Sequence, residues 1–261
     1  MKIMIICVLV CLFAASANGA IYDIFGNKIS DKTPGPGVNW PNANLSNANL
    51  FDVNFSYAEL YRVNLTYAQL TYANFTYAYL YKANLSYAQL LTAILTNANL
   101  YYANLSEANL SEVNLSGADL RYADLERAQL PSAILTNANL SNADLIHVNL
   151  SSSNLQYANL QYVNFSYAIL YYADFSYANL RNASLSNAYL SNTDFSGAKY
   201  NANTTFPAGF DPVAAGMILD NCDYDLPGDV NNDCKFDLLD FSIMAGNWLA
   251  ICPGDPACVP E

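Results

Sequence analysis

A five-residue pattern without insertions or deletions occupies most of this chain. From Val38 to Tyr200, an apolar residue, usually Leu or Phe, recurs at every fifth position, and a small apolar residue, usually Ala or Val, stands two positions before it. The three remaining positions are mostly Asn, Ser, Thr or Tyr. About thirty copies follow one another, which is the signature of a repeat architecture.

A period of five fits neither regular element, because a helix repeats its apolar face every 3.6 residues and a strand every two. It does fit a short extended segment followed by a turn. In Ala43-Asn44-Leu45, strand alternation points Ala43 and Leu45 inward, and Ser46 and Asn47 then turn the chain through about a right angle. Four such sides close a square coil of about twenty residues, and coils stack about 4.8 Å apart. The repeat therefore predicts an all-β solenoid of about eight coils, in which each coil is stabilised by its neighbours.

The motif resembles that of the pentapeptide-repeat family, A-(D/N)-L-x-x. Ala98-Asn99-Leu100, Ala118-Asp119-Leu120 and Ala143-Asp144-Leu145 match it directly. The resemblance covers about three-fifths of the chain and implies a right-handed quadrilateral β-helix. It implies little about activity, since members of the family share an architecture and mostly bind or scaffold. Pairing of such rods is common in the family, so the resemblance also implies a homodimer as one expectation.

The first residues are typical of a secretory signal peptide. In residues 1–20, Lys2 precedes an apolar core and Ala17-Asn18-Gly19 is a small-residue cleavage site. No later apolar run approaches the length of a membrane span. We therefore expect a secreted or cell-envelope protein of a bacterium, without a transmembrane segment after the signal is removed.

After the signal peptide, the chain is expected to form four segments. A segment rich in Pro and Gly, residues that interrupt regular structure, precedes the repeat array (residues 38–200). The five-residue phase is lost after the array. We expect a short helix after Pro212 to help close the last coil. The segments are an N-terminal cap (21–37), the β-helix (38–200), a C-terminal cap (201–219) and a small tail (220–261).

The tail contains a predicted calcium loop. Oxygen-bearing side chains occupy positions 1, 3, 5, 9 and 12 of a twelve-residue segment, and a backbone carbonyl faces the ion at position 7, as in an EF-hand. Apolar residues at three-and-four spacing after the loop predict a helix. A solvated acidic turn is the alternative. The predicted Ca²⁺ ligands are Asp229, Asn231, Asp233, Lys235 (through its carbonyl), Asp237 and Asp240.

Residues 227–249 resemble one half of a dockerin, the calcium-dependent module that attaches secreted proteins to cohesin partners in polysaccharide-degrading assemblies. Dockerins carry two loop–helix copies, and this tail has one match. Position 6 of the loop is Cys234 in place of Gly, which costs on the order of 1 kcal/mol. Loop positions 10 and 11 help to select the partner in dockerins, and here they are Leu238 and Leu239. The resemblance implies Ca²⁺ as cofactor and a cohesin-like protein partner.

Four cysteines lie beyond the signal segment, all in the tail. A tail of this length cannot build a sufficient core, and an exported chain favours two disulfides. Three pairings are open. A metal–thiolate site is the rival interpretation, disfavoured because the spacings are not of the CxxC type. The residues are Cys222, Cys234, Cys252 and Cys258.

Tyrosines recur at twenty-residue steps and should stack on successive coils. One interpretation is a structural ladder that ties coils together. The other is an aromatic platform for sugar rings. The pairs are Tyr57 and Tyr77, Tyr67 and Tyr87, Tyr102 and Tyr122, and Tyr157 and Tyr177.

Charge and motif content narrow the function classes. The array carries ten acidic against six basic residues, and the last sixty residues carry ten acids against Lys235 alone. Phosphate binding needs clustered Lys and Arg, so nucleic acid is not an expected partner. Neither paired carboxylates nor a Ser/His/Asp set occupies a usable position, so we do not expect an enzyme.

The sequence predicts an exported, non-catalytic scaffold tethered through its calcium module. A carbohydrate-binding rod that uses stacked Tyr faces is the alternative, and a DNA mimic is disfavoured because it requires a strongly acidic rod in the cytoplasm.

Overall fold

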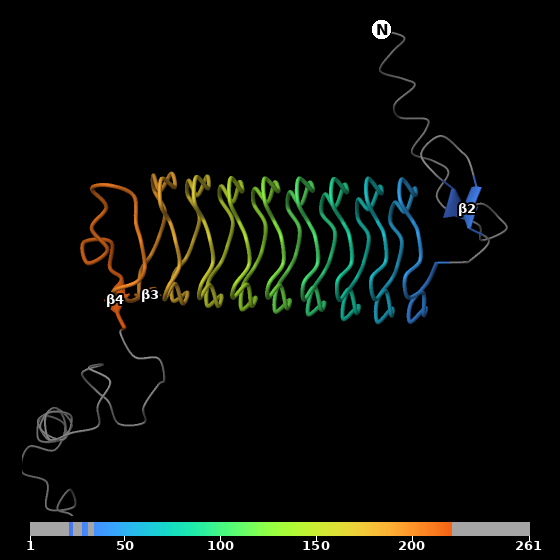
Figure 1. Ribbon diagram of the computed structural model, residues 1–261, viewed down its shortest axis with the longest axis horizontal. Coiled ribbons are helices and arrows are strands. Elements are labelled where there is room, and N and C mark those ends of the chain that lie inside the picture. Colours follow the sequence, from blue (N-terminus) through green and yellow to red (C-terminus); the bar gives the residue numbers. More distant parts are fainter. Residues whose placement is uncertain (1–20, 23–27, 31–33, 221–261) are drawn as a thin grey trace, which may run out of the picture.

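The computed structural model describes residues 21–22, 28–30 and 34–220. They form a long stack of similar coils, with short strand pairs at both ends (Figure 1). At the N-terminal end, β1 pairs antiparallel with β2, and at the C-terminal end β3 pairs parallel with β4. The strands are β1 (Ile21–Tyr22), β2 (Lys28–Ser30), β3 (Lys199–Tyr200) and β4 (Ile218–Leu219).

Between these strand pairs, single parallel bridges hold the coils together at twenty-residue steps. The middle residue of each side pairs with the middle residue twenty positions later, beginning with Asn39 and Glu59 and continuing to Lys199. Two backbone hydrogen bonds flank each bridge: Trp40 N donates to Glu59 O at 2.9 Å, and Glu59 N donates to Val38 O at 2.8 Å. The chain is a right-handed quadrilateral β-helix, and the twenty-residue register confirms the predicted square coil.

Both apolar positions of the repeat point into the coil. The Leu, Phe, Ala and Val side chains of the central coils are almost completely buried, and the rings of Phe55 and Phe75 lie 5.5 Å apart along the axis. Ser153 occupies one of the Ala positions and is buried as well. Its hydroxyl donates to the Leu150 carbonyl at 2.6 Å, so this inward polar group keeps a hydrogen bond.

Aromatic rings close both ends of this core. At the N-terminal end, the Trp40 ring packs edge-on against Phe55 with centroids 5.8 Å apart. At the other end, Phe210 packs against Phe195 at 5.5 Å and against Phe206 at 5.0 Å. These rings replace the next coil, which would otherwise cover the apolar column.

The C-terminal cap confirms one prediction and overturns another. The predicted loss of phase is present, because the last bridge joins Ser184 to Thr205, twenty-one positions apart. The predicted helix after Pro212 is wrong: residues 212–216 form turns. Ala215 N donates to Asp211 O at 3.1 Å, but Gly216 then adopts a φ of 76°, which ends the helical path and turns the chain into β4.

Two predicted segments lie outside the described residues, namely the signal peptide (1–20) and nearly all of the tail (221–261), with the helix expected after the calcium loop. Within the described part of the chain, no helix is long and apolar enough to span a bilayer.

Candidate functional site

Most of the site residues predicted from the tail fall outside the described residues. The structure therefore says nothing of the calcium ligands, the partner-selecting leucines or the cysteines. They are Asp229, Asn231, Asp233, Lys235, Asp237, Leu238, Leu239 and Asp240, with Cys222, Cys234, Cys252 and Cys258. The array is described in full, and its corners carry the remaining candidates.

Each corner is a turn with a left-handed residue at its second position. Thirty non-glycine residues between Asn42 and Asn192 have φ between 54° and 63°. An i to i+3 bond closes such a turn, as when Ala48 N donates to Leu45 O at 3.1 Å, and the geometry fits a type II turn. Left-handed backbone costs about 1–2 kcal/mol for a residue with a side chain. The bridges on either side must therefore hold each corner in place.

The asparagine in the middle of each side helps to set the following turn. Asn54 Oδ1 accepts the Ser56 backbone N–H at 3.0 Å, and Asn74 Oδ1 accepts the Thr76 N–H at 2.9 Å. The Thr76 hydroxyl donates to the same oxygen at 2.6 Å. The recurring Asn with a following Ser or Thr therefore stabilises the turn by local hydrogen bonds.

Stacking of the predicted tyrosine pairs is confirmed. Ring centroids lie 5.3 Å apart in Tyr57–Tyr77 and 4.8 Å apart in Tyr67–Tyr87, with interplanar angles of 14° in both. The pairs 102–122 and 157–177 stack at 4.9 and 5.2 Å. Rings stacked in this way turn their faces to one another, so the ladders present ring edges and hydroxyls outward. A role in glycan binding stays a prediction.

The Tyr87 hydroxyl continues its ladder to the next coil. It donates to Glu107 Oε1 at 3.1 Å. This hydrogen bond and the negative charge of Glu107 raise the pKa of Tyr87 above its usual value.

One corner combines tyrosines with positive charges, and we call it the basic corner. Two columns run side by side over four coils. The first reads Tyr, Tyr, Tyr, Arg and the second Arg, Lys, Tyr, Tyr. The basic corner consists of Tyr61, Tyr81, Tyr101 and Arg121 in the first column and Arg62, Lys82, Tyr102 and Tyr122 in the second.

Ring contacts join these residues from coil to coil. In the first column, Tyr81 stacks on Tyr61 and on Tyr101, with centroids 5.8 Å apart in each case. The Arg121 guanidinium lies 4.9 Å from the Tyr101 centroid. Across the columns, Lys82 Nζ lies 5.2 Å from the Tyr81 centroid. The cations therefore extend the ladders by cation–π contacts.

Arg121 differs from the other cations of the basic corner because it has an acidic partner. Its Nε and Nη2 donate to the two carboxylate oxygens of Asp119 at 2.8 and 2.7 Å. Partial burial acts to raise the pKa of Asp119, but the hydrogen bonds and charge of Arg121 outweigh it and hold that pKa below its usual value. Neither Arg62 nor Lys82 forms an ion pair with a residue that the structure describes.

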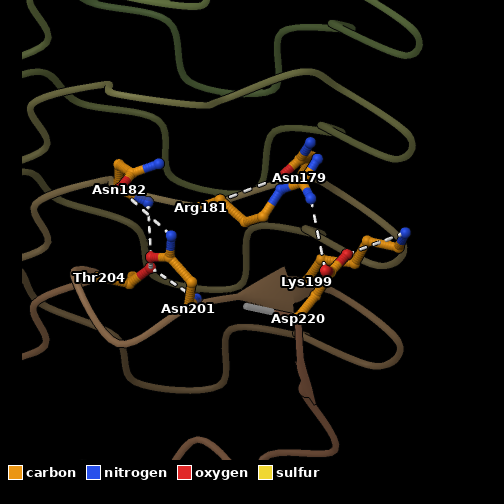
Figure 2. A network of polar contacts seen from close by, with 7 residues as sticks. All are labelled: Asn179, Arg181, Asn182, Lys199, Asn201, Thr204 and Asp220. Atoms are coloured by element: carbon orange, nitrogen blue, oxygen red, sulfur yellow. Dashed lines mark hydrogen bonds and ion pairs between the residues drawn. The ribbon is translucent and has the colours of Figure 1, made fainter. Parts of the chain in front are cut away.

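A polar network ties the last coil to the cap (Figure 2). Asp220 Oδ1 lies 3.4 Å from Arg181 Nη1, and Asp220 Oδ2 lies 3.1 Å from Lys199 Nζ. The side chains of Arg181 and Asp220 are both buried. On the neighbouring side, Asn182 N donates to Asn201 Oδ1 at 3.0 Å. Arg181 and Lys199 thus attach the cap to the last coil.

Comparison with known proteins identifies the array. A family model described as pentapeptide repeats matches the chain in eight copies, and the matched segments cover residues 37–199, more than half of the chain. This chain is a pentapeptide-repeat protein. Proteins of this family are generally non-catalytic and structural.

Solved pentapeptide-repeat structures resemble the chain to different extents. QnrB1, a plasmid-mediated fluoroquinolone resistance protein, is 17% identical, with 71% of this chain and 92% of that chain covered and a TM-score of 0.49. HetL, involved in heterocyst differentiation regulation in the cyanobacterium Nostoc sp. strain PCC 7120, is 30% identical, with 62% and 89% covered and a TM-score of 0.29. The protein alr5209 from Nostoc PCC 7120 is 32% identical, with 45% and 84% covered and a TM-score of 0.24. No curated protein matches the chain.

The basic corner of this pentapeptide-repeat protein is the feature that sequence reasoning missed. The signal was available, because the twenty-residue step used for tyrosines also places basic residues in register. Four of the six basic residues of the array lie in the turns of the same corner, in one or the other of its two columns, and none of the ten acidic residues of the array lies in those turns. The four are Arg62, Lys82, Arg121 and Arg181.

Proposed function

We propose that this protein is an exported, non-catalytic interaction scaffold: a rigid β-helical rod carried by a C-terminal calcium module. The observation that supports the rod is the ladder of parallel bridges, which continues at twenty-residue steps from Asn39 to Lys199. Such a ladder fixes every corner side chain at a regular height along the axis. Side chains held in this way form a surface that a partner can read without rearranging the rod.

The attachment of the rod is proposed from the sequence alone. The signal segment supports export, and the loop from Asp229 to Asp240 supports Ca²⁺ binding through its carboxylates and amide. By its dockerin-like pattern, the module would place the rod in a polysaccharide-degrading assembly through a cohesin-like partner contacted by Leu238 and Leu239.

Calcium titration of the full chain tests the tether. We expect a saturable heat of Ca²⁺ binding by isothermal titration calorimetry, together with a higher unfolding temperature of the tail, because a bound ion stabilises the state that holds it. The double variant Asp229→Asn, Asp240→Asn should lose both effects.

The matched control is Asp255→Asn, which removes a carboxylate from the same tail outside the loop. Equal Ca²⁺ binding in the double variant and in the control would contradict the calcium module. If Ca²⁺ binds but a cohesin domain is not retained by the Ca²⁺-loaded chain, the dockerin role fails and the calcium role stands.

A carbohydrate-binding rod is the second candidate. Exposed tyrosine ladders favour it: Tyr57 is 63% exposed and Tyr177 58% exposed. Because the faces of stacked rings are turned toward one another, recognition would use ring edges and hydroxyls, which suit a hydroxyl-rich ligand better than an aromatic one.

A further inference from the structure

We infer that the basic corner binds an acidic polysaccharide, a polymer of uronic acid units, along the axis of the rod. This goes beyond the tethered scaffold, because it assigns a ligand to a surface on the array and does not depend on the calcium loop. Three properties of the corner carry the inference: the segregation of charge, the covering of its ring faces and its linear spacing.

Charge segregation makes the corner unlike the rest of the rod. The whole chain has a formal net charge of −12, and the array has four more acidic than basic residues. Arg62 and Lys82 nevertheless stand in consecutive coils, on a corner whose turns contain no acidic residue. Both side chains are exposed, and their partners are tyrosine rings, which leave the positive charge uncompensated. The ligand should therefore be anionic.

The other basic residues near this column are not available in the same way. Arg121 pairs with Asp119 through two hydrogen bonds, and Arg181 and Lys199 hold Asp220 in the cap. The site thus centres on the coils of Arg62 and Lys82, with Tyr101 and Tyr102 continuing it toward the C-terminus.

The rings in the middle of the first column leave little face open for stacking. Tyr81 lies between Tyr61 and Tyr101, and the outer side of Tyr101 is covered by Arg121. A nucleobase needs an open ring face, so single-stranded nucleic acid fits this corner poorly. Tyrosine edges offer hydroxyls that donate and accept hydrogen bonds, which matches the hydroxyls of a sugar.

The spacing of the corner suits an extended polymer. Successive coils rise about 4.8 Å, close to the length of one sugar unit in an extended polysaccharide. A polyuronate carries one carboxylate on each unit, so neighbouring units can meet Arg62 and Lys82 while their hydroxyls face the tyrosine edges. The acidic face of a second copy is a poorer fit, since Glu107 already bonds Tyr87 and Glu126 already pairs with Arg127.

Binding of polygalacturonate to the full chain in the presence of a chelator tests the inference. We expect saturable binding by affinity electrophoresis and calorimetry that weakens as salt screens the charges. Fully methyl-esterified polygalacturonate keeps the hydroxyls but has no charge, and it should bind much more weakly. Lys82→Gln should weaken binding about two- to fivefold, the weight of one exposed charge pair, and Arg62→Gln with Lys82→Gln should weaken it further.

Arg127→Gln is the matched control, because Arg127 has the same turn position and a φ of 56° on another corner. It should leave binding unchanged. Tyr81→Phe keeps the ring and should weaken binding about twofold through the lost hydroxyl alone. Circular dichroism and the unfolding temperature of each variant verify that the rod is intact.

Several outcomes would overturn the inference: equal binding of the esterified polymer, equal loss in Arg127→Gln and Lys82→Gln, or tighter binding of polyglutamate or single-stranded DNA. The variant Asp229→Asn, Asp240→Asn should bind polygalacturonate as the parent chain does. Failure of the calcium tether and failure of this site are therefore separate results.

Discussion

The inward columns and the corner columns of this rod follow the same twenty-residue step, but only the inward ones are uniform. Inside, one set of columns is Leu or Phe in successive coils and the other is mostly Ala or Val, and nearly all of these side chains are buried. At the corners the residue changes along the axis, from Tyr61 and Tyr81 to Arg121 in one column and from Phe51 to Thr71 in another. The uniform interior makes coils interchangeable as building units. The variable corners distinguish one coil from the next, so the surface differences along the rod lie there.

The largest expected effect comes from the same kind of truncation made on an inward side chain and on an exposed one. Leu135 is completely buried, and its neighbour Ile134 is 42% exposed. Leu135→Ala should destabilise the chain by about 2–5 kcal/mol through lost burial and a cavity, and Ile134→Ala by less than about 1 kcal/mol. Urea unfolding followed by circular dichroism measures both. Similar losses in the two variants would mean that the inward column is not the main source of stability.

The cap gives the second largest effect, because a buried ion pair joins it to the last coil. Asp220→Asn removes the charge that Arg181 and Lys199 share. The expected loss is about 1–3 kcal/mol, since the guanidinium of Arg181 stays buried with a weaker partner. Limited proteolysis should cut the last coil of Asp220→Asn faster than that of the parent chain. The control Glu112→Gln, which removes the charge of an exposed corner carboxylate, should leave the rate of cleavage unchanged.

The inward columns explain why the fold could be predicted from the sequence. Each copy repeats the same apolar spacing, so the square coil follows from local alternation and a turn, and the register of Asn39 with Glu59 follows from counting. The cap could not be predicted in the same way. The turns after Pro212 depend on Gly216, and the buried pair of Arg181 with Asp220 joins residues thirty-nine positions apart.

The candidate site was predicted only in part, for a similar reason. Ladders of identical residues are visible in a periodic sequence, and Tyr67 with Tyr87 was found in this way. The basic corner mixes residue types, so no single-residue repeat reveals it. Recognising the basic corner requires that Tyr81, Lys82 and Tyr101 be placed on one corner and that the contacts between these unlike side chains be known. The calcium loop lies outside the described residues and stays a prediction.

A smaller effect tests how the corners tolerate left-handed tyrosines. Ser152 has a φ of 58°, so Ser152→Gly should stabilise the chain by about 0.5–1 kcal/mol, which is the relieved strain less the entropy cost of Gly. Tyr77 has a φ of 57° but also stacks on Tyr57. Tyr77→Gly should be close to neutral, because the lost stacking of about 0.5–1.5 kcal/mol offsets the relief. Equal stabilisation in the two variants would show that the ladders contribute nothing to stability.

The smallest effect comes from the carboxylate beside the basic corner and depends on pH. The pKa of Asp119 is lowered in the folded chain, because the bonds and charge of Arg121 outweigh the opposing effect of partial burial. A lowered folded-state pKa means that this pair contributes stability above the unfolded value of about 3.9 and loses it as the pH falls through the folded-state pKa. Because both side chains are partly exposed and solvent screens the pair, its contribution near neutral pH should be only a few tenths of a kcal/mol. Urea unfolding of the parent and of Asp119→Asn, from about pH 6 to about pH 2, should show a gap that closes at the acidic end. A gap that widens toward low pH would contradict the sign of the shift, and with it the assignment of Arg121 to Asp119 instead of to the ligand.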